Sequence, residues 1–117
     1  MATSIIKTDS SNAPITGVAD TTVATANKEN LSNLLVRTGN VVHIDLAVLF
    51  NTAVPTGNFA LIPADFRPST NVKVPCVWKN ASGVVHPYSV TIKTNGYIEQ
   101  NVGNNMANIA ISATYTI

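Results

Sequence analysis

The sequence predicts an all-β protein: an antiparallel β-sandwich of the jelly-roll kind, with seven to eight strands and a short extended N-terminal arm. Apolar and polar residues alternate with a period of two over several segments, as in strands that place one face on a core. Turn-forming Gly and Asn residues separate these segments at intervals of about ten residues, which is the spacing of a sandwich. Little of the chain shows a helical repeat.

Residues 1–33 are predicted to form an arm, neck or linker, and residues 34–117 the β-sandwich head domain. Ala, Thr, Ser and Asn dominate the arm, and its apolar residues come singly or in one pair. We expect a short strand at Ile15–Val18. Asn27–Leu31 could form one helical turn, although so short a segment cannot hold a stable helix alone.

The first strong strand signals lie on either side of Gly39-Asn40. Leu34–Arg37 precedes this pair and Val41–Phe50 follows it, and the pair permits the positive φ that a tight hairpin needs. One face of the second strand is wholly apolar, formed by Val42, Ile44, Leu46, Val48 and Phe50. We expect that face to lie on the core.

Further strands are predicted downstream, at Asn58–Ile62, Asn71–Trp78, Val84–His86, Tyr88–Lys93, Tyr97–Val102 and Ala107–Ile117. Ala81-Ser82-Gly83 is expected to form a turn, and Asn95-Gly96 suits a two-residue hairpin of type I′. Pro87 lacks an amide donor, so it indicates an edge position or a bulge.

Ile62–Ser69 contains Pro63 and Pro68, and a segment of this kind does not belong inside a helix or a central strand. We expect it to be a rigid link that crosses from one sheet to another. Asp65 and Arg67 could pair with each other, fix the link, or reach a saccharide. The structural role is favoured, because Arg commonly binds carbonyl or carboxylate groups at such crossings.

Composition limits the classes of partner. Charged residues make up 11% of the chain and the net charge is +1, with no basic run, so nucleic acid is not an expected partner. Apolar runs such as Leu46–Phe50 are too short to span a bilayer, so no membrane insertion is expected. A surface with little charge suits hydroxyl-rich ligands or packing against a partner. Cys76 is the single cysteine, which rules out an internal disulfide.

Three segments in order, Val36–Ile44, Ile62–Ser69 and Val90–Ile98, resemble the C-terminal head domains of tailed-bacteriophage receptor-binding and baseplate (tail fibre) proteins. The resemblance covers about residues 34–117 and concerns the scaffold. It implies a homotrimeric head at the distal tail tip or baseplate of a virion. Such heads bind a bacterial cell-wall or surface polysaccharide and assemble with other tail proteins. The resemblance implies no cofactor, and the sequence matches no catalytic motif of these heads.

The best saccharide candidates are aromatic and polar residues near predicted turns. Trp78 and Asn80 face His86 and Tyr88 across the Gly83 turn, and Tyr97 follows the Asn95-Gly96 turn. Sugar rings stack on aromatic faces, and their hydroxyls need donors and acceptors such as Asn and His. The alternative for Trp78 is a place in the core, because it alternates with Val72, Val74 and Cys76.

His43 and Asp45 form a second, weaker candidate group. They lie two apart on one strand and therefore on one face, where they could hold a metal or a sugar. With only two histidines in the chain and no third ligand in view, we expect no metal site. The alternative is a polar outward face or a contact at a trimer axis.

No catalytic machinery is recognisable, so a non-enzyme is predicted. Cys76 alternates with apolar residues, which predicts a buried side chain rather than a nucleophile. Outside the arm the acids are Asp45, Asp65 and Glu99, and they show no pattern typical of glycoside hydrolysis. Three alternatives to a receptor-binding head stay open: a structural baseplate or tail module without a saccharide site, a small polysaccharide depolymerase, and a carbohydrate module of a phage-derived bacteriocin particle.

Overall fold

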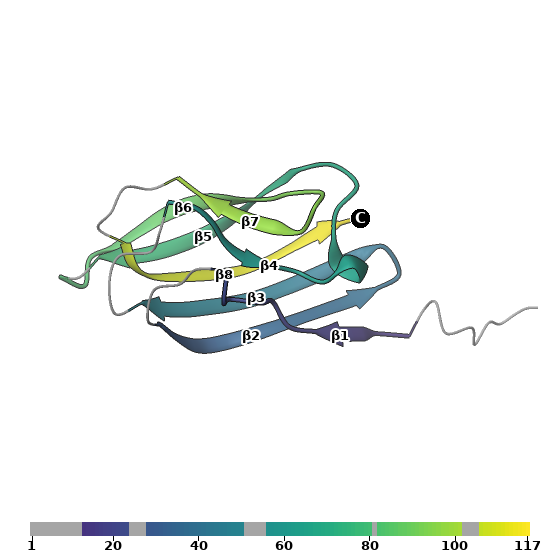
Figure 1. Cartoon of the computed structure of the whole chain (residues 1–117), viewed down its shortest axis with the longest axis horizontal. Coiled ribbons are helices and arrows are strands. Elements are labelled where there is room, and N and C mark those ends of the chain that lie inside the picture. Colours follow the sequence, from purple (N-terminus) through teal and green to yellow (C-terminus); the bar gives the residue numbers. More distant parts are fainter. Residues whose placement is uncertain (1–12, 24–27, 51–55, 81, 102–105) are drawn as a thin grey trace, which may run out of the picture.

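The all-β prediction is confirmed by a computed structural model, which describes residues 13–23, 28–50, 56–80, 82–101 and 106–117. The strands are β1 Ile15–Gly17, β2 Lys28–Thr38, β3 Val41–Phe50, β4 Gly57–Leu61, β5 Val72–Asn80, β6 Val85–Ile92, β7 Tyr97–Gln100 and β8 Met106–Thr116. They form one eight-stranded sheet in the order β1-β2-β3-β8-β5-β6-β7-β4, and every pairing is antiparallel. The sheet curls, so that its two halves face each other (Figure 1).

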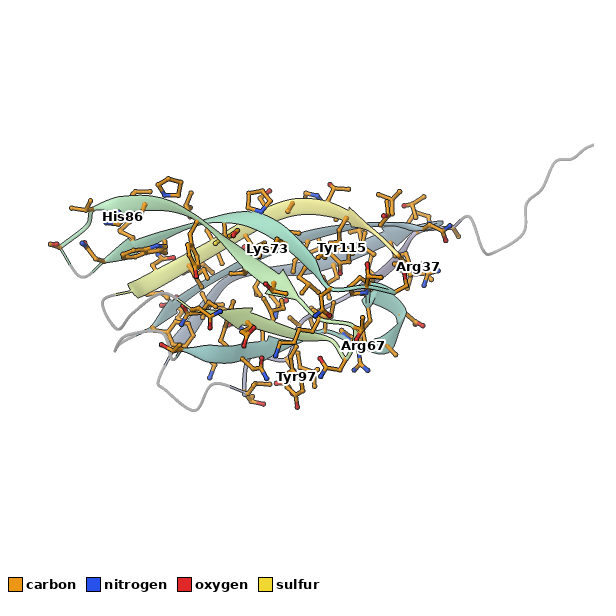
Figure 2. The ribbon with its side chains drawn as sticks, turned by 90° about the horizontal axis from the view of Figure 1, so that it is seen from above. Arg37, Arg67, Lys73, His86, Tyr97 and Tyr115 are labelled. Atoms are coloured by element: carbon orange, nitrogen blue, oxygen red, sulfur yellow. The ribbon has the colours of Figure 1, made fainter. Side chains whose placement is uncertain are left out.

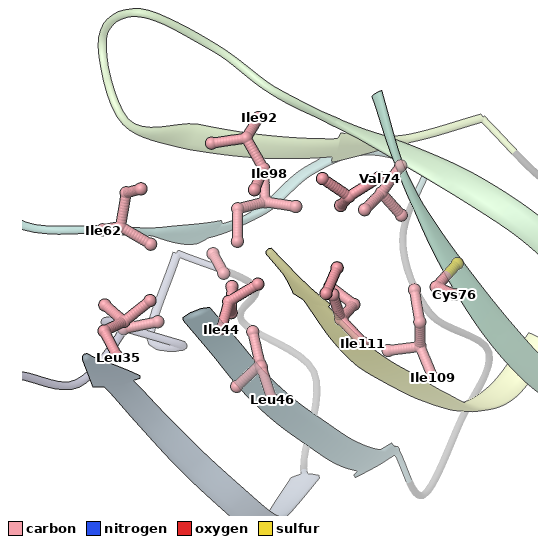
Figure 3. Close-up of a cluster of buried hydrophobic side chains, with 14 of the residues drawn as sticks. Leu35, Ile44, Leu46, Ile62, Val74, Cys76, Ile92, Ile98, Ile109 and Ile111 are labelled. Carbon is pink, nitrogen blue, oxygen red and sulfur yellow. The ribbon is translucent and has the colours of Figure 1, made fainter. Parts of the chain in front are cut away.

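The core lies inside the curl and is built from one face of each long strand (Figure 3). The predicted inner face of β3 is confirmed, since its five apolar residues are at most 2% exposed. On β8, the alternate residues Ile109, Ile111, Ala113 and Tyr115 are buried as well. Each Å² of apolar surface that is buried contributes about 25 cal/mol of free energy, so this face is the main source of stability.

The N-terminal region joins the sheet earlier than expected. β1 confirms the short strand near Ile15, whereas the helical turn predicted at Asn27–Leu31 is wrong, because β2 begins at Lys28. Lys28 and Glu29 pair with the end of β3, and this long-range pairing outweighs a weak local helix preference. The predicted boundary at residue 34 falls inside β2; residues 1–12 and 24–27 lie outside the described ranges.

Residues 15–21 connect the two edges of the curled sheet. β1 pairs with β2 at Leu35–Arg37, and the chain then reaches β4, where the backbones of Asp20 and Leu61 exchange two hydrogen bonds of 2.8 and 2.9 Å. A sheet of this kind otherwise presents unpaired backbone groups at its first and last strands. This segment supplies hydrogen-bonding partners to β2 and to β4, which would otherwise be the two edge strands.

Between these two pairings, the side chain of Asn33 replaces a backbone partner. Its Oδ1 accepts from the Ala19 amide and its Nδ2 donates to the Ala19 carbonyl, each at 2.8 Å. The carboxamide thus matches both polar groups of one peptide position, as a neighbouring strand would. Ala19 is 4% exposed, so these backbone groups would have poor access to water without Asn33.

The two hairpins on either side of β6 share one geometry. The Gly96 amide donates to the Lys93 carbonyl, and the Lys93 amide donates to the Tyr97 carbonyl. The turn therefore closes between Lys93 and Gly96, and the two-residue Asn95-Gly96 turn predicted from the sequence is wrong. Gly96 instead follows the turn with φ at +93°, a common arrangement in longer hairpin loops. The β5–β6 hairpin repeats these bonds with Asn80, Gly83 and Val84.

The link after β4 contains a short 3-10 helix, η3, at Ala64–Phe66. Three side chains donate to backbone carbonyl oxygens of the link. Arg67 Nε donates to the Ile62 carbonyl at 3.0 Å, and Arg37 Nη1 donates to the Asp65 carbonyl at 2.8 Å. The Tyr115 hydroxyl donates to the Phe66 carbonyl at 2.6 Å. The Phe66 side chain is buried against Gly17 of β1. The link is therefore fixed to β2, to β8 and to β1.

We expect Gly96→Ala to destabilise the fold more than Gly83→Ala. Both glycines have φ near +90°, where alanine costs about 1 kcal/mol. A Cβ at Gly96 would also meet Arg67 Nε and lie 2.6 Å from the Ile62 carbonyl oxygen. Among the described residues other than its chain neighbours, none has an atom within 4 Å of a Cβ at Gly83. Urea unfolding should show an additional loss of about 1–3 kcal/mol for the first variant. Equal losses would contradict the close packing of the link on the β6–β7 turn.

Asn33→Asp should lower the free energy of unfolding by about 1–3 kcal/mol, because a carboxylate cannot donate to the Ala19 carbonyl. Asn40→Asp is the matched control, since Asn40 is exposed and contributes its backbone carbonyl to Ile117. Thermal melts of both variants at neutral pH measure the difference. A loss for the control as large as for Asn33→Asp would argue against the specific pairing.

Candidate functional site

An aromatic pair stands at the β5–β6 hairpin. Trp78 and His86 are direct cross-strand partners, and their rings stack with centroids 4.2 Å apart and planes inclined by 21°. Both side chains are half-buried. They continue the core-facing rows of Val74 and Cys76 on β5, at the point where the core reaches the end of the sheet. Trp78 therefore packs against the core and is also partly accessible.

The turn beside this pair is organised by Asn80. Its Oδ1 accepts three hydrogen bonds, from the Ser82 amide at 3.1 Å, the Ser82 hydroxyl at 2.9 Å and the Val84 amide at 2.9 Å. A side-chain oxygen that binds amides further along the chain is a common device for stabilising a turn. The oxygen is committed to the turn, which leaves the amide NH₂ group of Asn80 as its donor toward a ligand.

Tyr88 belongs to the same cluster. It lies opposite Cys76, on the core-facing side of β6, and is half-buried. Its hydroxyl accepts a hydrogen bond of 3.3 Å from the Asn101 amide, just after β7 ends. We name the four residues Trp78, Asn80, His86 and Tyr88 the hairpin cluster.

Tyr97 is not part of the hairpin cluster, although the sequence suggested both as saccharide contacts. It begins β7 and pairs with Leu61 of β4. β6 runs between the two hairpins, and eight residues of strand span about 27 Å. Figure 2 shows His86 at one end of the molecule and Tyr97 with Arg67 towards the other.

His43 and Asp45 lie on the outer face of β3, on the same side as expected, but they bind different neighbours. His43 Nδ1 lies 3.3 Å from the Thr114 hydroxyl on β8, and the Ser32 hydroxyl on β2 donates to Asp45 Oδ1 at 3.1 Å. Within the described ranges, no three His, Cys, Asp or Glu residues are grouped so that they could hold a metal ion.

Asp65, Glu99 and Cys76 have separate environments. Asp65 is exposed on η3, and Glu99 on β7 lies 3.7 Å from the ammonium group of Lys93. Cys76 is buried as predicted, and burial raises the pKa of its thiol to about 11. Because the thiolate is the reactive form, this cysteine is a poor nucleophile at neutral pH.

A shallow groove on the outer face of the sheet was not predicted from the sequence. One part, of about 150 Å³, is lined by Val77, Trp78, Lys79, Val85, Asn108 and Ala110. A second part, of about 230 Å³, is lined by Pro75, Cys76, Val77, Ala110 and Ser112. The signal was present in β5, where Pro75 and Val77 make the second face of the strand apolar as well.

No protein-family model matches the chain, and no curated protein matches it. In the part of the chain that the structure describes, no helix has the length and apolar character needed to cross a membrane. The fold and the local chemistry therefore carry the functional argument.

The free energy of unfolding should fall as the pH rises from 9 towards 11. Burial raises the pKa of the Cys76 thiol from 9.0 to about 11 and raises the pKa of the Tyr115 hydroxyl. The folded chain holds these protons more tightly than the unfolded chain, so this stabilisation is complete below pH 9 and is lost above it. Cys76→Val should lose less stability over the same range. Urea titrations of both proteins test this, and parallel pH profiles would refute a role for the thiol.

Proposed function

We propose that the chain is a non-catalytic head of a bacteriophage tail fibre or baseplate that adsorbs to a saccharide on the bacterial surface. The observation that carries this proposal is the stacked Trp78–His86 pair, which is partly exposed at one end of the sheet. The resemblance of three ordered segments to phage head domains supports the same function.

The aromatic pair suits a sugar for physical reasons. The C–H face of a pyranose packs on flat aromatic surfaces, and these two rings hold each other in a fixed orientation. A ring already fixed by packing loses little conformational entropy when a ligand binds. The imidazole nitrogens of His86 and the NH₂ group of Asn80 provide polar groups for sugar hydroxyls.

The placement of the three carboxylates in the predicted head domain favours binding over hydrolysis. A glycosidase places two carboxyl groups on either side of one glycosidic bond. In this chain Asp45 binds Ser32 on the outer face of β3, and Glu99 lies beside Lys93 on β7. Asp65 stands on η3 at the opposite end from the hairpin cluster.

Assembly would strengthen binding at weak sites. A homotrimer at the tail tip, held there by other tail proteins, offers several copies of the cluster to one surface. Binding of the first site then raises the effective concentration of the others, and avidity can exceed single-site affinity by 10²–10⁴. Reversible adsorption of this kind requires no tight individual site.

Binding to purified bacterial cell-wall polysaccharides, measured by glycan array and calorimetry, tests the proposal. His86→Ala should weaken binding at least about tenfold, since it removes one ring of the stack and a polar contact. Val18→Ala, which changes an exposed side chain beyond the end of β1, should bind as the wild type does. Circular dichroism verifies that both variants fold.

Other outcomes would overturn the proposal in distinguishable ways. No binding at millimolar saccharide would favour a purely structural baseplate or tail module. Release of reducing sugar ends would identify a depolymerase instead. Binding that survives His86→Ala but is lost in Tyr97→Ala would place the saccharide at the opposite end of the sheet.

A further inference from the structure

The outer face of β2, β3, β8, β5 and β6 carries exposed apolar side chains among its polar ones. Four large apolar side chains on it are strongly exposed: Leu34 at 45%, Val41 at 44%, Val77 at 43% and Val85 at 57%. The outward face of an antiparallel sheet is normally polar when it meets solvent. An extended exposed apolar surface usually marks an interaction site.

The centre of this face is a row of small or apolar residues. Ala47 on β3 lies opposite Ala110 on β8, Ala110 lies opposite Val77 on β5, and Val77 lies opposite Pro87 on β6. Both parts of the shallow groove include Val77 and Ala110, so the groove runs along the seam between β5 and β8. We name this surface the Val77 face.

Charged groups on the Val77 face stand away from this central row. Lys79 lies one row beyond Val77 on one side, and Lys73 lies two rows beyond it on the other. Asp45 lies one row from Ala47, and its carboxylate accepts the Ser32 hydroxyl within the same chain. Covering the central row would therefore bury little unpaired charge.

We infer that the Val77 face is an interface between copies of this chain. Five strands are about 20 Å across and eight residues are about 27 Å long, which gives roughly 500 Å² of surface. A biological interface buries at least about 1,000 Å² in total, or about 500 Å² on each partner, so the face reaches the lower end of that range. A sugar or other small ligand would leave most of it exposed.

The interface would lie beside the proposed binding site. Trp78, Lys79 and Val85 line the end of the groove, so a neighbouring copy on the Val77 face would contact the same hairpin that carries the stacked rings. This inference deepens the proposed function, because it rests on assembly into a multivalent head and names the surface that assembles.

Light scattering and sedimentation of the full chain test whether the Val77 face joins copies of it. Val77→Asp is the test variant. The wild type should have a mass of two or more times 12.3 kDa at micromolar concentration. Val77→Asp should shift half-dissociation to at least about tenfold higher protein concentration, because it places a charge in the covered row. Val18→Asp, at a 58% exposed position beyond β1 and away from this face, should keep the wild-type mass.

Val85→Asp provides a second variant on the same face, at a position that is 57% exposed, in case Val77→Asp does not fold. A monomeric wild type would overturn the inference, and so would an oligomer that neither substitution on the Val77 face weakens. The saccharide proposal fails separately, since single-site binding by a monomer would retain the His86 dependence while the mass measurement shows no assembly.

Discussion

The structure depends on how the two edges of one curled sheet are joined. An open antiparallel sheet leaves backbone donors and acceptors unpaired along its first and last strands, and a buried unpaired group is costly. Here residues 15–21 pass between β2 and β4 and pair with both. Asn33 completes the contact where the backbone alone does not, through two hydrogen bonds to Ala19. The core on the concave face can then be enclosed without a second, separate sheet.

The two ends of the sheet have different tasks. At one end, Arg37, Arg67 and Tyr115 bind three carbonyls of the link around η3, and Gly96 packs directly on that link. At the other end the core finishes in half-buried aromatic rings, and the β5–β6 turn is held mainly by its own Asn80. The first end is held by side chains from several elements of the sheet, whereas the turn at the second end is held within one hairpin.

The sequence was sufficient for most of the fold, because period-two alternation reports directly which face of a strand is buried. The five inward residues of β3 and the burial of Cys76 follow from that rule alone. The start of β2 at Lys28 did not, since its polar residues are held by pairing with β3 rather than by local preference. The role of Asn33 could not be predicted either, because its hydrogen-bonding partner Ala19 lies fourteen residues away in the chain.

The candidate site was predicted in part for the same reason. Trp78, Asn80, His86 and Tyr88 lie within one hairpin, so local sequence was enough to bring them together. Tyr97 is nearer to Tyr88 in the chain than Trp78 is. It nevertheless lies beyond the far end of β6, about one strand length from the β5–β6 turn. The groove along Val77 and Ala110 joins β5 to β8, and no local pattern indicates which strand lies next to β5.

The open space around Gly83 bears on how such a head would change over time. Its turn repeats the hydrogen bonds of the Gly96 turn, but apart from its chain neighbours no atom of the described residues lies within 4 Å of where its side chain would be. Residues can therefore be exchanged or inserted there at little expense to the packed end. Under the proposed function, a lineage could alter the surface next to its sugar-binding rings, and so its range of hosts, while the scaffold stayed constant.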